Sequence, residues 1–487
     1  MAKITAVIDI GSNSMRMAIF KKTSQFGFYL LYELKSKVRI SQGTYEHGGI
    51  LQKAPIKRAI KALSEFKEIA QKYKSKKLLC VATSAVRDAP NAQEFVALVR
   101  KECGLRVRVI DGIKEAFYGG VACANLLHHR EGITIDIGGG STECALIKEG
   151  KIADLLSLDL GTIRLKELFF DKDAPLQSAL DFIAKELVKI PAHYQSVQVF
   201  GVGGTIRAIA KLAIQRNNYP IEVVHGYEMG VGDHIDFIYD IAQSSQARLE
   251  VLGVSADRQD SIRGGALILW ALLKRLNPQK IVASGVGVRE GVFLSDMLRN
   301  HKHSFPKGIN PSILSLLDRF LPHAQHSQEV KRVCVKLFEV LSPLHRISTE
   351  YLYHLKIAGQ LSGIGKVLNF YGAHKHAAYL ALNALSYGFS HQDRAIICLL
   401  VQFSQKKIPK DSNIAHISTI MPPILTLQWL SFILGLAEAL CTTRVPKDIV
   451  YTLKGKTLLI KSAKELYLCQ EMIPKLNTPI ALDIEFL

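Results

Sequence analysis

The chain has 487 residues, more than a single hydrophobic core normally serves, so we expect several domains. It is 48% hydrophobic and 22% charged, which is typical of a folded protein. The 62 Lys and Arg residues exceed the 43 Asp and Glu residues and give a net charge of +19, so we expect polyanionic partners, among them nucleotides, polyphosphate, nucleic acid or a membrane surface. The eight cysteines form no Cys-x-x-Cys pair, which argues against a zinc site or a disulfide framework and favours a reducing cytoplasm.

The first motif lies close to the start of the chain. Residues 4–20 begin as an apolar strand, with no signal peptide before them, and contain Asp-Ile-Gly-Ser-Asn-Ser at residues 9–14. Glycine lets a backbone turn tightly and bring its N–H groups close to an anion, and the hydroxyl groups add donors. This stretch is therefore a candidate phosphate-binding loop.

Alternating strands and helices are predicted after it. Apolar residues recur at helical spacing over residues 56–69, which predicts an amphipathic helix with a strongly basic polar face. Asn91 has the position and side chain of a helix start. Residues 105–110 alternate like a strand, and residues 114–127 predict a helix with Glu115 in its first turn.

The second motif repeats the first. Residues 133–143 read Ile-Thr-Ile-Asp-Ile-Gly-Gly-Gly-Ser-Thr-Glu, so that Asp136 matches Asp9 and Glu143 ends the loop. Carboxylates repel phosphate, but they are suited to a divalent cation such as Mg²⁺ that also contacts the phosphate. A plain glycine-rich hairpin turn is the alternative interpretation. The repeat favours a duplicated α/β domain with a cleft between the copies.

Two further glycine turns follow predicted strands. One lies at residues 201–205 and the other at residues 284–291. We expect all four glycine turns to join a strand to a helix, as nucleotide- and phosphate-binding α/β folds require.

The last part of the chain has a different character. Residues 310–487 have mainly helical periodicity, with a few strands near residues 449–461 and at the end. The apolar residues 424–441 are interrupted by polar side chains and predict a buried helix rather than a membrane span. Residues 360–367 resemble a nucleotide-binding P-loop but miss its template twice. The remaining candidates for a metal site are three scattered histidines, for which a structural role is favoured, namely His354, His374 and His376.

The order of the four glycine motifs resembles that of the exopolyphosphatase/guanosine pentaphosphate phosphohydrolase (Ppx/GppA) family. The resemblance is strongest over residues 4–300. It implies an actin-like fold of ribonuclease-H type, with two such domains at residues 1–128 and 129–304 and an interdomain cleft. Residues 305–487 would form a mainly helical domain resembling the HD phosphohydrolases.

The resemblance also implies roles for individual residues. Glu115 matches the catalytic glutamate: the family usually has several glutamates in the segment at residues 110–116, and here only Glu115, directly before the alanine, is kept. The metal ligands would be Asp136 and Glu143, with Asp9 close by. The implied phosphate-binding residues are Gly11, Ser12, Asn13, Ser14, Arg16, Arg87, Gly138, Gly139, Gly140, Ser141, Thr142, Gly203, Gly204 and Thr205.

The helical domain departs from the family pattern. Ser362 and Gly363 stand where the metal-binding His-Asp pair is expected, although the His-x-His of residues 374 and 376 is kept. A second metal centre is therefore doubtful on the sequence. We expect this domain to contribute to binding, dimerisation or substrate length preference.

The function implied is phosphoanhydride hydrolysis. Mg²⁺ and a water activated by Glu115 would release the terminal phosphate from polyphosphate, from guanosine pentaphosphate (pppGpp, to give ppGpp), or from both. The latter activity would link the chain to stringent-response signalling. We expect a cytoplasmic homodimer without a specific nucleic-acid or membrane partner. The alternatives are an ATP-dependent kinase of the same fold and a non-catalytic nucleotide or polyphosphate sensor.

Overall fold

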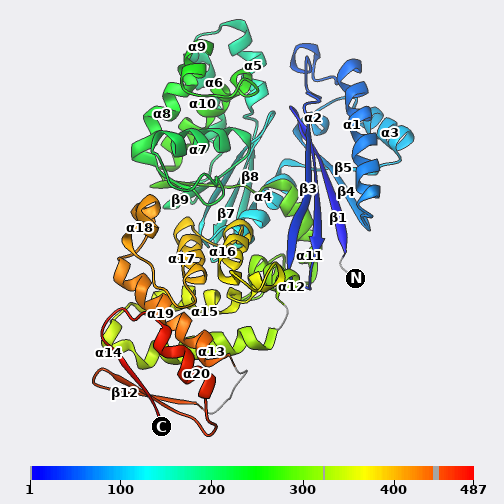
Figure 1. Cartoon of the computed structure of the whole chain (residues 1–487). Helices are drawn as coiled ribbons and strands as arrows, with labels where there is room; N and C mark the ends of the chain where they lie inside the picture. Colours follow the sequence, from blue (N-terminus) through cyan, green and yellow to red (C-terminus); the bar gives the residue numbers. More distant parts are fainter. Residues whose placement is uncertain (1–2, 322–323, 443–448) are drawn as a thin grey trace. The chain divides into compact units, whose positions relative to one another are not determined.

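The computed structural model describes residues 3–321, 324–442 and 449–487. Contacts within the chain divide it into two units. The first comprises Met1–Lys22 and Phe28–Ile309, and the second comprises Thr23–Gly27 and Asn310–Leu487. Figure 1 colours both units along the sequence.

The first unit begins with a mixed five-stranded sheet. We call it the lobe I sheet, and we call the two halves of the unit built around this sheet and the next one lobe I and lobe II. Its strand order is β3-β2-β1-β4-β5. The first three strands of the sequence pair antiparallel, and β4 and β5 are added in parallel. The strands are β1 (Ile4–Ile10), β2 (Met15–Lys22), β3 (Phe28–Ser36), β4 (Lys77–Ala82) and β5 (Val107–Val109).

The second sheet, the lobe II sheet, repeats this order. Read from β8 it runs β8-β7-β6-β9-β11, and β10 extends it at the far edge. Antiparallel pairing of the first three strands and parallel addition of the next two are also repeated. This confirms the predicted duplication. The strands are β6 (Gly132–Ile137), β7 (Thr142–Lys148), β8 (Lys151–Leu158), β9 (Gln198–Val202), β10 (Glu228–Gly230) and β11 (Lys280–Ala283).

The prediction that every glycine turn joins a strand to a helix is wrong for the first two turns. They connect antiparallel strands, with Asp9 opposite Arg16 in one hairpin and Asp136 opposite Glu143 in the other. The Gly138 N–H donates to the Ser141 carbonyl at 2.9 Å, which closes a turn short enough for the next strand to pair back. Only the later two turns lead into helices, α7 (Gly204–Arg216) and α11 (Val288–Met297).

The amphipathic helix predicted for residues 56–69 is α1 (Lys53–Lys72). Leu63 and Phe66 are among the side chains that it buries in the core of lobe I. The helix expected after Asn91 is α3 (Ala92–Cys103), but Asn91 makes no capping bond with its side chain. Its amide instead exchanges two hydrogen bonds with the Leu51 backbone, at 2.9 and 3.0 Å. The predicted helix start at Asn91 is therefore confirmed, although the side chain does not cap the helix.

Two helices cross between the lobes. Helix α4 (Gly112–Leu126) follows the last strand of lobe I but packs against β7 and β8 of lobe II. Helix α11 follows β11 of lobe II and packs against β1, β2 and α4. Where the two helices meet, a Cβ on Gly291 would lie 1.9 Å from the Tyr118 carbonyl oxygen, so only glycine fits there. The other helices of this unit are α2 (Ser84–Arg87), α5 (Thr162–Leu168), α6 (Leu176–Leu187), α8 (Val231–Gln243), α9 (Gln246–Val251) and α10 (Gln259–Leu276).

The second unit is mainly helical, as the sequence predicted. Its central helix, α19 (Ile424–Leu440), is buried along most of its length, with Trp429 and Phe432 in the core. No single described helix is long and apolar enough to cross a bilayer, although the bent pair Asp411–Ile420 and Ile424–Leu440 reaches that length and composition together. The other elements are α12 (Pro311–Phe320), α13 (Ala324–Val340), α14 (Ser342–His345), α15 (Leu352–Leu361), α16 (Ala373–Ala384), α17 (His391–Gln402), α18 (Asp411–Ile414), α20 (Tyr467–Met472), β12 (Val450–Lys454), β13 (Thr457–Lys461) and β14 (Asp483–Phe486).

Candidate active site

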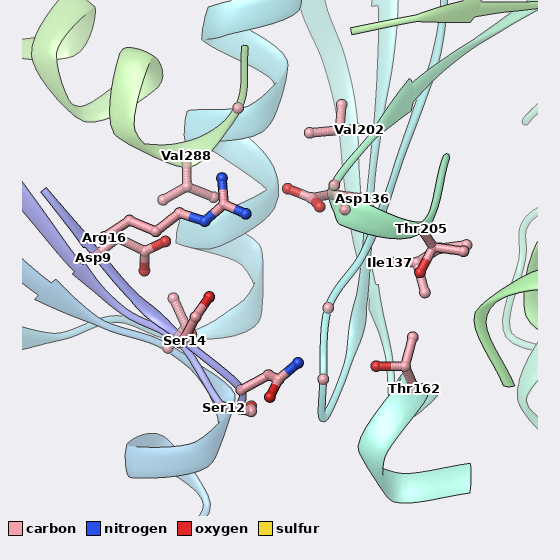
Figure 2. A pocket seen from close by; sticks show the side chains of 18 of the residues that line it. Asp9, Ser12, Ser14, Arg16, Asp136, Ile137, Thr162, Val202, Thr205 and Val288 are labelled. Carbon is pink, nitrogen blue, oxygen red and sulfur yellow. The ribbon is translucent and has the colours of Figure 1, made fainter. Parts of the chain in front are cut away.

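A cleft of about 170 Å³ lies between the two lobes of the first unit. Asp9 and Arg16 project into it from lobe I, and Asp136 and Thr205 face them from lobe II (Figure 2). The cleft brings together most of the site residues predicted from the sequence. Those that line it are Asp9, Gly11, Ser12, Asn13, Ser14, Arg16, Glu115, Asp136, Gly138, Gly139, Gly203, Gly204 and Thr205.

The remaining predicted residues, among them Gly140, do not line the cleft. Thr142 is fully buried and its hydroxyl donates to the Leu160 carbonyl at 2.6 Å. Glu143 is 2% exposed, and its Oε1 accepts from the Ser157 hydroxyl at 3.1 Å. Ser141 is 2% exposed and contacts Arg87. Ser141, Thr142 and Glu143 are therefore buried next to the cleft lining and are not part of it.

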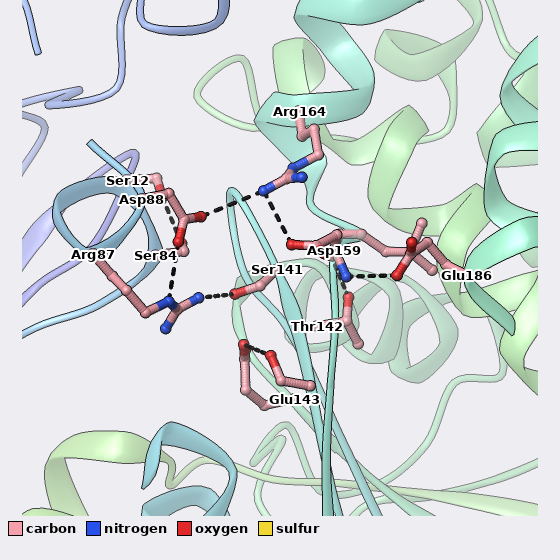
Figure 3. Close-up of polar contacts among 12 residues, drawn as sticks. Ser12, Ser84, Arg87, Asp88, Ser141, Thr142, Glu143, Asp159, Arg164 and Glu186 are labelled. Atoms are coloured by element: carbon pink, nitrogen blue, oxygen red, sulfur yellow. Dashed lines mark hydrogen bonds and ion pairs between the residues drawn. The ribbon is translucent and has the colours of Figure 1, made fainter. Parts of the chain in front are cut away.

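Arg87 connects the two lobes at the candidate base. It donates from Nη1 to Glu115 Oε2 at 3.1 Å. It also donates from Nη2 to Ser141 Oγ at 3.3 Å (Figure 3). Its Nε also donates to Asp88 Oδ1 at 3.1 Å. With its guanidinium engaged by these three partners, Arg87 orients Glu115.

The carboxyl groups of this region are held in an environment that disfavours their charge. Burial raises the pKa of Asp9 and of Asp136 to about 6, although Arg289 and Arg207 respectively oppose the shift. Burial also raises the pKa of Glu115 well above its usual range, and the nearby Glu143 carboxylate raises it further, while Arg87 lowers it. The pKa of Glu143 is raised as well, first by burial. Four ionised carboxylates here would need added positive charge.

Two buried oxygens of these four carboxyl groups have no hydrogen-bond partner among the described residues. They are Asp9 Oδ1 and Glu143 Oε2. An unpaired buried carboxylate oxygen is costly, and a hard divalent cation with oxygen ligands removes that cost. Two of the three predicted ligands, Asp9 and Glu143, therefore each have an oxygen whose need for a partner a divalent cation would meet.

Crowded arginines supply the opposite charge. Burial lowers the pKa of Arg16 to about 10, and the neighbouring charges of Arg207 and Arg289 add to the shift. Burial and the charge of Arg289 also lower the pKa of Arg207. Glu33 partly compensates them, with its Oε1 2.6 Å from Arg289 Nη1. A polyanion entering the cleft would relieve this repulsion.

The glycines of lobe II make room for these side chains. Gly203 has φ +95°, and a Cβ there would lie 2.9 Å from Asp136 Oδ1. A Cβ on Gly204 would lie 2.3 Å from Arg258 Nη1, and one on Gly139 would lie 2.6 Å from Ser12 Cβ in the opposite hairpin. These glycines therefore set how closely the loops and the charged groups approach.

Several lining residues were missed from the sequence. Arg207 follows the third glycine turn and Arg289 lies within the fourth, so their position at these motifs was a usable signal. Lys35 and Arg258 follow no motif, and only the fold brings them to the cleft. The missed lining residues are Lys35, Thr83, Ser84, Ile137, Thr162, Val202, Arg207, Asp257, Arg258, Ser261, Gly287, Val288, Arg289 and Glu290.

The two crossing helices begin alike at the cleft. Gly112-Ile-Lys-Glu115 opens α4 and Gly287-Val-Arg-Glu290 opens α11. In α4 the Asp111 carboxylate accepts from the Lys114 N–H at 2.6 Å and so caps the helix. In α11 the cap position is Gly287, and Glu290 itself accepts from the Gly287 N–H at 2.8 Å. Of the two glutamates, Glu115 is thus the one not used as a cap.

The histidines considered as metal ligands lie in the second unit. His354 Nε2 is 2.7 Å from Asp393 Oδ1, an ion-pair arrangement within the helical core. Within the described ranges, the one group of three or more converging potential ligands is instead in the first unit, at His128, His129 and Glu228. There Lys280 Nζ already lies 2.8 Å from Glu228 Oε2 and supplies a counter-charge.

Comparisons with known proteins agree on one family. Residues 18–300 match the model of the Ppx/GppA phosphatase family, and residues 310–475 match that of Ppx/GppA phosphatase, domain III. A guanosine-5'-triphosphate,3'-diphosphate pyrophosphatase of Pseudoalteromonas translucida is 28% identical over 476 residues, covering 93% of this chain and 91% of the relative. One of Aeromonas hydrophila is 25% identical over 411 residues, covering 82% and 80%.

Solved structures give the same answer. The Aquifex aeolicus member of the Ppx/GppA protein family is 30% identical, with a TM-score of 0.51, and the match covers 62% of this chain and 99% of that one. An exopolyphosphatase of Cytophaga hutchinsonii, 24% identical with a TM-score of 0.55 over 62% of this chain and 100% of that one, shares the fold. The chain belongs to the Ppx/GppA phosphatase family.

Proposed function

We propose that this chain is a phosphoanhydride hydrolase that releases the terminal phosphate from pppGpp, from inorganic polyphosphate, or from both. The observation that carries the proposal is the cleft. In it a glutamate that does not cap its helix lies together with two glycine hairpins and a group of crowded arginines. Relatives of nearly the same length are named as guanosine-5'-triphosphate,3'-diphosphate pyrophosphatases, which supports the same reaction here.

The arginines and the hairpins suit a chain of phosphates. Arg16 and Arg207 carry cationic charge that burial and the repulsion of neighbouring arginines disfavour, so phosphate oxygens lower their energy on binding. The Gly11 and Gly138 turns line the cleft, and Ser12 and Ser14 add hydroxyl groups to its lining. Phosphoryl transfer depends mainly on such positioning and charge stabilisation.

Glu115 is the proposed general base. Glu115 lines the cleft, and Arg87 fixes its position. Because Asp111 caps the helix, the Glu115 carboxylate is not needed for capping. Its raised pKa gives the carboxylate the basicity needed to take a proton from an attacking water. That water would attack the terminal phosphorus in line with the leaving phosphate, which breaks the anhydride bond and frees orthophosphate.

We propose Mg²⁺ as the cofactor, held by Asp136 and Glu143 with Asp9 nearby. The unpartnered oxygens of Asp9 and Glu143 support this assignment. When bound, the cation would supply positive charge to the phosphoryl oxygens. It would also offset the repulsion among the carboxylates that raises the pKa of Glu115.

For residues 310–487 we propose a non-catalytic role. We propose that this part of the chain resembles the HD phosphohydrolases but lacks their metal centre. Ser362 stands at the expected His-Asp position, and its hydroxyl donates to Glu438, which supports a structural use of that position. The eight cysteines are all free and buried, which supports the proposed cytoplasmic setting. The homodimer stays a prediction.

The proposal is tested by phosphate release from polyphosphate and from pppGpp, measured side by side with and without Mg²⁺. We expect Mg²⁺-dependent release of orthophosphate from at least one of the two. The nucleotide product is identified by chromatography, so that loss of the terminal phosphate can be told from other cleavages. Absence of release from both substrates with Mg²⁺ present would refute the proposal and favour a binding protein.

A further inference from the structure

A second cavity lies behind the cleft, on the other side of the crossing helices. It has a volume of about 580 Å³, and we call it the rear pocket. Strands β4 and β5 form one wall of it and helices α4 and α11 form another. Helix α4 borders both cavities, because Glu115 faces the cleft while Lys114, the residue before it, lines the rear pocket. The rear pocket is within the size range of ligand-binding cavities.

The inner surface of the rear pocket is largely apolar. Leu79 and Val81 of β4 and Val292 of α11 contribute aliphatic residues to its lining. Tyr118 of α4 adds an aromatic side chain that is 4% exposed. Such a surface suits a flat, apolar group, whereas a bare chain of phosphates would place ionic oxygens against hydrocarbon.

The rim of the rear pocket is strongly basic. Lys77 and Arg299 share the single lining carboxylate, Asp296, which forms a short ion pair with Lys77 and lies 3.5 Å from Arg299. Arg106 and Arg108 are exposed on successive outward positions of β5 and its approach. Across the parts of the chain that the structure describes, neither of these two arginines lies within ion-pair distance of a carboxylate. The rim therefore has uncompensated charge for an anion.

Two buried polar atoms at the rear pocket also lack partners. Among the described residues, neither Ser295 Oγ nor His303 Nδ1 has a hydrogen bond. Both residues line the pocket. Lys114 adds a further cation, which lies 4.2 Å from the ring centre of Phe117 and 5.1 Å from that of Tyr118. A ligand with both a planar ring and phosphate groups would suit this pocket. Its ring would contact the aromatic carbon, and its phosphates would pair with the cations and the unpaired polar groups.

We propose that the rear pocket binds a nucleotide, with its base against the apolar wall and its phosphates at Arg106, Arg108 and Lys114. The site is separate from the catalytic cleft, because it shares no lining residue with it. The proposal does not depend on the cleft being a hydrolase. It requires only that the rear pocket bind a ligand that carries a base more tightly than a bare phosphate.

The test is equilibrium binding of GDP to the full chain in EDTA, with chromatography to verify that the GDP stays intact. The double variant Arg106→Gln/Arg108→Gln is compared with the wild type. Arg100→Gln/Lys101→Gln is the matched control, because it removes two exposed positive charges from helix α3 of the same lobe. Arg289→Gln changes the catalytic cleft and leaves the rear pocket intact.

We expect the wild type, the Arg289→Gln variant and the control to bind one equivalent of GDP at the rear pocket. In Arg106→Gln/Arg108→Gln this binding should be lost or weakened about tenfold or more. Tripolyphosphate and orthophosphate should bind this site at least about tenfold more weakly than GDP, because they leave the apolar wall uncovered. Unchanged GDP binding in the double variant would overturn the proposal. Equal binding of GDP and tripolyphosphate would overturn the nucleotide assignment.

Discussion

Arg87 Nη1 lies 3.1 Å from Glu115 Oε2, so the proposed catalytic base is bonded to a cation before any substrate arrives. The contact has two consequences. It fixes the orientation of a carboxylate that burial would otherwise leave protonated, and it opposes the charge of Glu143, which raises the Glu115 pKa. Because Arg87 also donates to Ser141, the same side chain ties the base to the second hairpin.

Replacing Arg87 by Gln should therefore raise the pKa of Glu115 further. At neutral pH we expect a loss of activity of about tenfold to a hundredfold, since a charge-assisted hydrogen bond contributes roughly 1.5–3 kcal/mol. Part of the loss should be recovered at higher pH, where Glu115 ionises again. The measurement is kcat across a pH series; a variant with the wild-type profile would show that Arg87 does not act on the base.

The pH profile of the wild type should depend on Mg²⁺. Only ionised Glu115 can accept a proton, so activity is lost as pH falls through its raised pKa. A cation beside Asp136 and Glu143 lowers that pKa, and the acidic limb should move to lower pH as Mg²⁺ approaches saturation. An acidic limb that stays at one pH at all Mg²⁺ concentrations would argue against the proposed metal ligands.

Gly203→Ala should damage the site and the fold together. The residue has φ +95°, which costs a side-chain-bearing residue about 1–3 kcal/mol, and the new methyl group would displace the Asp136 carboxylate. We expect a lower melting temperature and a loss of activity larger than the loss of stability explains. Gly119→Ala in helix α4 is the matched control, because a Cβ there meets nothing within 4 Å and should be neutral or slightly stabilising.

Asp393→Asn should destabilise the helical unit. The carboxylate receives hydrogen bonds from Ser390 at 2.7 and 2.9 Å and contacts His354 at 2.7 Å. Burial alone would raise the pKa of Asp393, but these bonds outweigh it and the pKa is lowered. The stabilisation, about 1–3 kcal/mol, is thus present above the unfolded pKa and is lost as pH falls through the folded one. Thermal unfolding at several pH values checks this, with the exposed Asp411→Asn as control; equal melting temperatures at neutral pH would contradict it.

Much of the fold was readable from local patterns. The spacing of residues 56–69 predicted α1, and the match between Asp9 and Asp136 predicted the duplication, because a repeated sequence folds into a repeated unit. The connection after each glycine turn was not readable. The same glycine-rich stretch can close a hairpin or start a helix, and the outcome depends on whether the next segment pairs with the strand before it.

The site was predictable only where its residues belong to motifs. Asp136 and Gly138 belong to a motif that the neighbouring residues make recognisable. Lys35 lies on strand β3 and Arg258 directly before helix α10, far apart in the sequence, and only the fold places both at the cleft. Glu143 lies in the motif but not at the cleft surface, because the strand β7 buries it beside Ser157. The crossing of α4 and α11 between the lobes has no local signal at all.

The central claim is that Glu115 removes the proton from the attacking water. The direct test is single-turnover phosphate release by Glu115→Gln with Mg²⁺ and the better of the two substrates, together with substrate affinity. We predict a fall in rate of about 10²–10⁴-fold with affinity close to wild type. Glu290→Gln, which keeps an acceptor for the Gly287 N–H, should lose much less activity. Phosphate release by Glu115→Gln at near the wild-type rate would contradict the account.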